Sequence, residues 1–177
     1  MGDSLGTVIV IAIAAILMFV FPLMTMADRT DDVSQLTVQT ETTEFVDEIR
    51  TTGKITPEKY DQFVQSITST GNLYDVDIEV KVLDENPGVK TTQTSYTKIG
   101  ENIYYTQYTT QILNEIEQND KHKKVLKEGD IVTVKALNTN TTIAQLLRNF
   151  LYRVAGNDTS SIAASHSGII TSNGGNY

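Results

Sequence analysis

The sequence predicts an α+β fold: a long N-terminal α-helix, transmembrane at first and then a stalk, followed by a small α+β head with an antiparallel sheet. Three observations predict this fold. Residues 7–26 are apolar and uncharged, residues 28–50 contain no glycine or proline, and the later segments alternate between helical and strand-like spacing of apolar side chains. The expected division is therefore a membrane helix and stalk at residues 1–50 and a head domain at residues 51–177.

The apolar segment is long enough for a membrane helix, because at 1.5 Å per residue it spans roughly 30 Å, the hydrocarbon thickness of a bilayer. A cleaved secretory signal would carry a basic N-terminal region, but residues 1–6 contain no Lys or Arg. A buried core helix would need a larger domain than the polar remainder of the chain provides. We therefore expect a retained single-pass membrane helix, in which Pro22 removes one backbone hydrogen bond near the end.

The composition limits the classes of partner and chemistry. The 177 residues carry a formal net charge of −8 at pH 7, which argues against nucleic acid or an anionic lipid surface as the main partner. The chain contains no cysteine, which excludes disulfides, a thiol nucleophile and thiolate metal ligands. Arg29 is the one basic residue next to the apolar segment, so the positive-inside rule gives little indication of orientation.

Residues 28–50 are expected to continue the membrane helix as a stalk, giving one rod from about Leu5 to Arg50. Threonine is frequent here and lowers intrinsic helicity, so packing must hold the rod together. Val38, Phe45 and Ile49 stand at i, i+7 and i+11 on one helical face. Two interpretations stay open: the stalk is solvated, or this face packs against neighbouring copies of the rod.

Turn and cap signals organise the beginning of the head. Gly53 is expected to end the rod, and Thr56 with Pro57 is expected to begin a short helix. That helix carries apolar residues at i, i+3, i+4 and i+7 and ends at Gly71. Residues 73–83 then alternate apolar and charged side chains, which predicts an antiparallel strand with one solvent-exposed face.

A turn at residues 84–88 and a loop or edge strand at residues 89–102 are expected next. Apolar and aromatic residues at i, i+3, i+7, i+8 and i+11 then predict a helix from about Tyr105 to Gln118. Its tyrosines are expected to face the core rather than to form a platform for a sugar or nucleotide. A second strand is expected at residues 131–137.

The last third of the chain contains a basic run, an amphipathic helix and a weakly patterned end. Residues 121–124 are expected to form a solvated loop, or a docking point for the acidic stalk of a neighbouring copy. Thr142 is expected to cap a helix at residues 143–154 that packs on the sheet. A last strand is expected near residues 167–172, and residues 55 to about 156 are expected to form a compact head without the anchor.

No catalytic, cofactor-binding or metal-binding constellation emerges, and we expect a non-enzymatic protein without a cofactor. His122 lies in the basic run, and His166 follows Ser165 in a serine-rich segment without a strand–turn–helix nucleophile motif. The acidic residues of segment 73–83 alternate as the solvent face of a strand does, and they lack the glycine of an EF-hand loop.

Helix packing is the one kind of site that the sequence indicates. Ala12 and Ala15 are small residues three positions apart in the centre of the membrane segment, and small residues let helices approach closely in a bilayer. Val38, Phe45 and Ile49 are the corresponding candidates in the stalk. The alternative for the alanines is ordinary contact with lipid.

Several stretches carry a resemblance to a known family. They are Asp31-Asp32-Val33, residues 43–50 with 52–56, residues 70–76, Tyr104-Tyr105, Gln111-Ile112-Leu113, and Gly129-Asp130 before Val132-Thr133-Val134. Through them the chain resembles small TadE-like pseudopilins, pilin-like proteins encoded with the Flp/Tad (tight adherence) pilus machinery of Gram-positive bacteria. The resemblance covers nearly the whole chain.

This resemblance implies a pilin-like structural subunit or pseudopilin, anchored by its N-terminal hydrophobic helix, that takes part in assembling a surface pilus or filament. Its partners would be the membrane and other copies of itself or other pilins, contacted through the N-terminal helix. The head would be extracellular, on a single-pass protein of the cell membrane or in an extracellular filament. The alternative is a single-pass membrane accessory protein, a scaffold or a sensor, that never polymerises.

Overall fold

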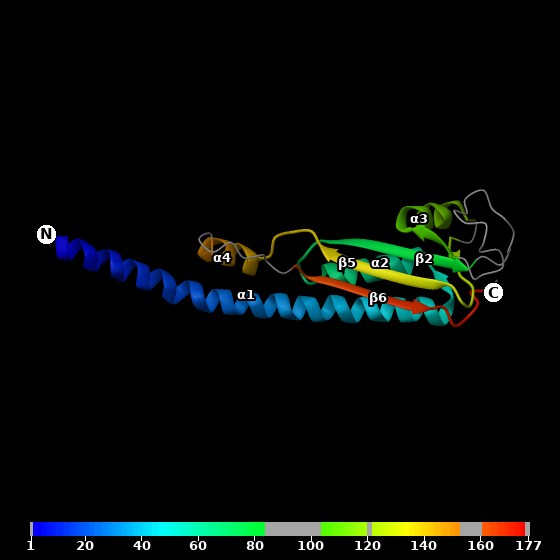
Figure 1. The fold of residues 1–177 in the computed structure, drawn as a ribbon, viewed down its shortest axis with the longest axis horizontal. Helices are drawn as coiled ribbons and strands as arrows, with labels where there is room; N and C mark the ends of the chain where they lie inside the picture. Colours follow the sequence, from blue (N-terminus) through cyan, green and yellow to red (C-terminus); the bar gives the residue numbers. More distant parts are fainter. Residues whose placement is uncertain (1, 84–103, 120–121, 153–160, 176–177) are drawn as a thin grey trace, which may run out of the picture.

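Figure 1 shows an elongated molecule in which helix α1 (Gly2–Thr52) runs along nearly the full length and the head lies against its C-terminal half. The structure is a computed structural model that describes residues 2–83, 104–119, 122–152 and 161–175. The predicted fold class is confirmed, because a long N-terminal helix precedes a head of mixed helices and antiparallel strands.

The threonine-rich part of α1 remains helical with its hydroxyl groups bonded inside the helix. Thr30, Ser34 and Thr42 each donate a hydroxyl to the carbonyl four residues earlier, at distances of 3.1, 2.9 and 2.6 Å. These bonds satisfy side chains that would otherwise compete with the helix from outside. The helix ends at Gly53, whose φ is 63° and whose N–H donates to the carbonyl of Ile49, as the sequence indicated.

The head is built on a four-stranded antiparallel sheet. Ile78 lies opposite Val134 and Val80 lies opposite Val132, which places apolar side chains on one face. Charged residues such as Asp77 are exposed on the other face, so the predicted strand with one wet face is confirmed. In spatial order the strands are β3 (Tyr104–Tyr108), β2 (Tyr74–Leu83), β5 (Ile131–Asn138) and β6 (Ala163–Ile169).

The core forms where α1, α2 (Pro57–Thr68) and α3 (Thr109–Gln118) bring apolar side chains to the apolar face of the sheet. Helix α2 begins as predicted, since the Thr56 hydroxyl accepts the N–H of Lys59 at 3.4 Å and Pro57 occupies the first turn. The helical residues of the core are Val38, Phe45, Val46 and Ile49 of α1, Phe63 and Ile67 of α2, and Ile112 and Ile116 of α3.

The role expected for the stalk residues is wrong. Val38, Phe45 and Ile49 are buried in the core of their own chain, so they are neither solvated nor available to a neighbouring copy. Helical spacing correctly identified the buried face of α1, but it did not reveal that the head of the same chain covers that face. A boundary after residue 50 therefore does not separate two packed units, because the core of the head includes residues of α1. The compact head also extends beyond residues 55–156, because Ile162 and Ile170 belong to the same core.

The sequence did not indicate a second, two-stranded sheet. Strands β1 (Lys54–Ile55) and β4 (Lys124–Val125) pair antiparallel beside the end of α1. Lys124 is buried there, and its ammonium lies 2.6 Å from the carboxylate of Glu115 in α3. This lysine of the basic run is thus used inside the chain and is not a docking point for another stalk.

The helix predicted from Tyr105 begins four residues later than expected. Residues 104–108 form strand β3, which pairs with the end of β2, and α3 starts at Thr109. Tyr105 and Tyr108 are half or more exposed, so the expectation of core-facing tyrosines is wrong. Their i, i+3 spacing resembles a helix, but aromatic residues also favour strands, and pairing with β2 decides the outcome.

Helix α4 (Ile143–Tyr152) and strand β6 are also placed differently from the predictions. Figure 1 shows α4 alongside α1, beyond the end of the sheet in the direction of the N-terminus, rather than packed on the sheet. Strand β6 begins at Ala163 instead of near residue 167, because its serines and alanines give no alternating pattern. The expectations for residues 84–88, 89–102 and 153–154 lie outside the described residues.

Two glycines give a matched test of how tightly α1 is joined to the C-terminal segment. A Cβ at Gly53 would lie 2.3 Å from the carbonyl oxygen of Ser172, whereas a Cβ at Gly71 would meet open space; both glycines have positive φ. We expect Gly71→Ala to lower the free energy of unfolding by about 1 kcal/mol, from backbone strain alone. Gly53→Ala should cost about 3 kcal/mol, because overpacking is added to the strain.

Denaturant unfolding of the full chain in detergent micelles measures this difference. Equal losses in the two variants would contradict the close approach of Gly53 to the C-terminal segment.

Candidate functional site

The N-terminal half of α1 is largely exposed within the described structure; Leu17, Val20 and Met24, on the side of α1 that also carries Asp28 and Asp31, are partly covered. Large apolar side chains such as Met18 and Phe19 are more than two-thirds exposed, and no window of this segment is buried by the head. By length and composition the segment is able to cross a membrane. Near its end, the Thr25 hydroxyl donates to the carbonyl of Phe21 at 3.1 Å, so this polar group is satisfied inside the helix, next to Pro22.

An apolar stripe continues from this segment along the side of α1 that faces away from the sheet. Ala15 and Val33 are eighteen residues apart, which is five full turns, so they lie on one line of a straight helix. Ala12, Met26 and Leu36 lie within about 60° of that line. We call these five residues the outward stripe; all five are exposed, whereas the buried residues of α1 lie on its other side.

The outward stripe changes the list of residues available for association. Ala12 and Ala15, the candidates from the membrane segment, are exposed and free to contact a neighbouring helix or lipid. In the stalk, Val33 and Leu36 replace the three candidates that are buried in the head. Their exposure could not be read from spacing alone, because the sequence does not say which face of the rod the head covers.

Helix α4 is held against α1 by polar contacts just beyond the apolar segment. The Arg148 guanidinium lies 2.6 Å from the Asp28 carboxylate, and the Thr142 hydroxyl donates to the Asp31 carboxylate at 2.7 Å. Thr142 and Gln145 also form a reciprocal cap, in which each side chain accepts the other residue's backbone N–H. Thr142 is therefore the N-cap that the sequence indicated, and it also ties α4 to α1.

Helix α1 also covers one of the two edges of the sheet, the edge formed by β6. The Gln35 side-chain amide donates to the carbonyl of Ala163 and accepts its N–H, as a neighbouring strand would, at 2.7 and 3.0 Å. At the other end of β6, the Arg50 side chain donates to the carbonyl of Ile169 at 3.1 Å. Because an open strand edge invites pairing with other chains, these contacts direct association away from β6.

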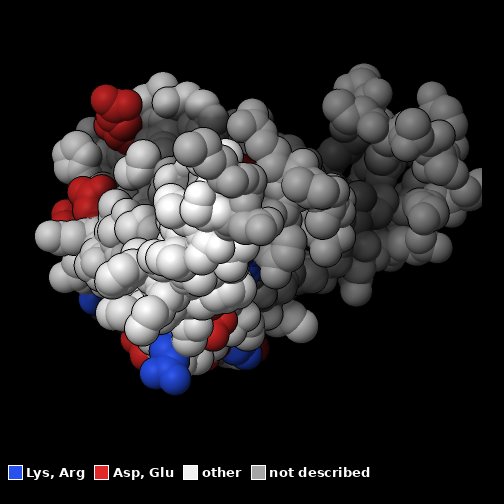
Figure 2. Space-filling view, turned by 90° about the vertical axis from the view of Figure 1, so that its left-hand side faces the viewer, with Lys and Arg blue, Asp and Glu red and all other residues white. Residues whose placement is uncertain are grey.

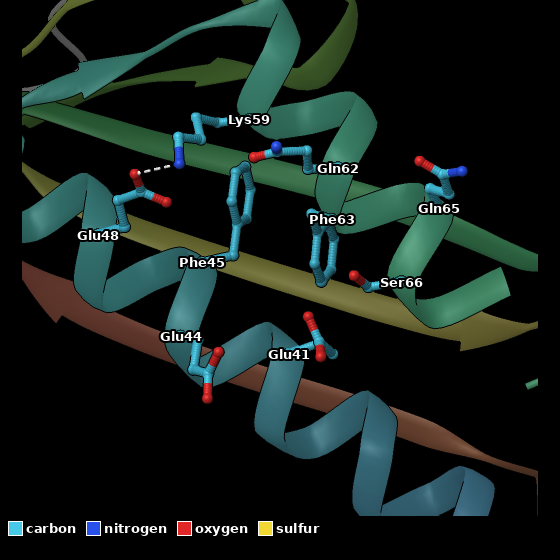
Figure 3. A pocket seen from close by; sticks show the side chains of 9 residues that line it. All are labelled: Glu41, Glu44, Phe45, Glu48, Lys59, Gln62, Phe63, Gln65 and Ser66. Carbon is cyan, nitrogen blue, oxygen red and sulfur yellow. Dashed lines mark ion pairs between the residues drawn. The ribbon is translucent and has the colours of Figure 1, made fainter. Parts of the chain in front are cut away.

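A groove of about 360 Å³ lies between α1 and α2, with carboxylates at its rim (Figure 3). Phe45 and Phe63 stack inside it with ring centroids 4.6 Å apart, and both are buried. At one end the Glu48 carboxylate lies 2.9 Å from the Lys59 ammonium. Since both rings are buried and stacked on each other, we interpret the groove as the seam where α2 packs on α1 rather than as a ligand site.

The shifted pKa values of α2 have structural causes. Hydrogen bonds from its own backbone N–H and from the Thr56 hydroxyl lower the pKa of the exposed Glu58 carboxyl at the start of the helix. Burial raises the pKa of the Tyr60 hydroxyl, and the negative charges of Asp61 and Asp75 add to the effect. Capping and packing explain both shifts, so neither one indicates a catalytic group.

The histidine and acidic residues do not gather into a reactive site within the described residues. Ser165 and His166 are consecutive in β6, and consecutive strand residues point to opposite faces of the sheet. Their side chains are thus not placed as a nucleophile and its base. Among the residues that the structure describes, no three His, Asp or Glu side chains lie together as metal ligands would.

Comparison with protein-family models, with curated proteins and with solved structures finds no match to this chain. Inferences about function therefore depend on the geometry of α1, α4 and the head.

The contact between Thr142 and Asp31 predicts a local change in stability. Asp31→Ala removes the charged acceptor of a buried hydroxyl, which should speed amide hydrogen exchange in α4 by about tenfold or more. Asp32→Ala is the matched control, since Asp32 carries the same charge but is exposed. Equal exchange rates in α4 of both variants would show that this hydrogen bond does not hold α4 on α1.

Proposed function

We propose that the protein is a pilin-like structural subunit, anchored by its N-terminal hydrophobic helix, that takes part in assembling a surface filament. The observation that carries this proposal is the division of α1 into an exposed apolar half and a half that belongs to the core of the head. A subunit of this shape can leave a bilayer and enter a filament without refolding. The same apolar segment can face lipid in the bilayer and neighbouring helices in the filament.

The outward stripe supplies the contacts for such an assembly. Within the apolar segment, Ala12 and Ala15 allow close approach of another helix. Outside it, Val33 and Leu36 are each 65% exposed, and fully covering a side chain of this kind contributes roughly 1.5–3 kcal/mol. The partners would be other copies of the chain or other pilins, which meet α1 on the side opposite to its own head.

The proposal places the head outside the cell, on a single-pass protein of the cell membrane and, after assembly, in an extracellular filament. It rests here on the resemblance to TadE-like pseudopilins, because the charges beside the apolar segment do not decide the orientation. The polar outer face of the sheet would then be turned to the surroundings.

A second candidate is a single-pass membrane accessory protein, a scaffold or a sensor, that does not polymerise. The observation in its favour is that no side chain described in the apolar half of α1 is buried, which suits a lone helix in lipid as well as it suits a filament. This alternative requires no contact along the outward stripe. Protein sheared from the cell surface as fibres would favour the first candidate, and protein confined to the membrane pellet would favour the second.

Photo-crosslinking tests the outward stripe directly. Because the chain has no cysteine, a benzophenone maleimide attached to Leu36→Cys labels one position only. We expect ultraviolet light to link neighbouring copies from position 36 and not from Lys135→Cys, which lies on the outer face of the sheet. Replacing Ala12 and Ala15 together with Leu should abolish these links, since the larger side chains hold the helices apart.

The control for that double variant is Ile13→Leu with Ile16→Leu, which keeps the segment apolar without adding bulk. Links from position 135 instead of 36, or unchanged links in the Ala12→Leu, Ala15→Leu variant, would overturn the role of the outward stripe.

A further inference from the structure

We infer that α4 is an interfacial helix that lies among the lipid headgroups beside the exit point of α1 from the membrane. This inference rests on the membrane anchor in the proposed function, but not on polymerisation.

The depth of α4 follows from its contacts with α1. Asp28 and Asp31, which bind Arg148 and Thr142 of α4, stand two and five residues after Met26, the last residue of the apolar segment. At 1.5 Å per residue they lie about 3 and 7.5 Å beyond it along α1. The polar layer on each side of a bilayer is about 5–8 Å thick, so both contacts fall within it.

The exposed side chains of α4 suit that layer. Ile143 is 70% exposed and Leu146 is 58% exposed, and these two residues are three apart on one side of the helix. The polar side chains of Thr142 and Arg148 are turned to α1 instead. In water this arrangement leaves apolar surface uncovered, whereas at an interface the apolar side of a helix is covered by acyl chains and headgroups.

The charges of α4 also permit contact with lipid. Arg148 is the one charged residue in the sequence of this helix, and it is paired with Asp28. Figure 2 looks at the molecule from its N-terminal end, so the apolar half of α1 points towards the viewer; the described side chains in the centre of this view are uncharged, and charged ones lie towards its left and lower edges. Because the chain is acidic overall, zwitterionic lipid is the expected surface.

An interfacial α4 would fix how the subunit sits in the membrane. It contacts one side of α1, so it would set both the depth of the apolar segment and the rotation of α1 about its axis. The outward stripe would then point along the membrane plane in a defined direction before any neighbour arrives.

Fluorescence quenching in phosphatidylcholine vesicles tests this inference with the full chain. The environment-sensitive dye NBD is attached to Leu146→Cys, and separately to Ile16→Cys in the apolar segment and to Asp61→Cys on α2. Nitroxide placed on the lipid headgroup should quench most of the emission from position 146 and leave position 61 unchanged. Nitroxide placed deep on the acyl chain should quench position 16 most strongly.

Two results would overturn the inference while leaving the anchor in place. In the first, position 16 is quenched by deep nitroxide, but position 146 is as insensitive to lipid nitroxide as position 61. In the second, emission from position 146 is shifted to the blue without lipid quenching and depends on the protein-to-lipid ratio, which would show that a second copy covers α4. Absence of quenching at position 16 would overturn the membrane anchor and this inference together.

Discussion

Burial of one side of α1 against the sheet is the interaction on which the rest of the structure depends. Val38, Phe45, Val46 and Ile49 of α1 belong to the same core as the apolar face of β2 and β5. The helix that supplies them is also the one whose first half is able to cross a membrane. A single continuous element therefore joins a segment able to cross a membrane to the protein core, and the head cannot turn freely relative to that segment.

Polar contacts at three positions along α1 also hold the head against this helix. Asp28 and Asp31 hold α4, Gln35 covers the beginning of β6, and Arg50 covers its end. Each contact uses the side of α1 that faces the head, which leaves the outward stripe for neighbours. The β6 edge of the sheet, which could otherwise pair with other chains, is covered by the same helix. Both features favour association through α1.

The sequence predicted the elements whose signals are local. The uncharged run at residues 7–26, the Thr56–Pro57 start of α2 and the alternation in β2 each depend on a few adjacent residues, and all were found where expected. Elements that depend on distant partners were misplaced. Tyr105 has helical spacing but joins a strand because β2 lies beside it, and β6 has no pattern of its own and is defined by pairing with β5.

The residues proposed for helix association were likewise predicted only in part. Ala12 and Ala15 were identified by size alone and lie exposed, but the stalk candidates were taken from the face that the head itself covers. Spacing at i, i+7 and i+11 reveals that a helix has an apolar side without revealing whether a sheet or a neighbouring subunit packs on it. Val33 and Leu36 became candidates only when the position of the head was known.

The most direct test of the shared helix is to compare the unfolding of two fragments, residues 28–177 and residues 53–177. The longer fragment keeps the four core side chains of α1 and should unfold in one cooperative transition. The shorter one lacks them, and at roughly 1.5–3 kcal/mol for each buried side chain the loss is comparable with the whole stability of a domain, about 5–15 kcal/mol. It should show no cooperative transition. A transition of equal cooperativity in residues 53–177 would contradict the role of α1 as part of the core.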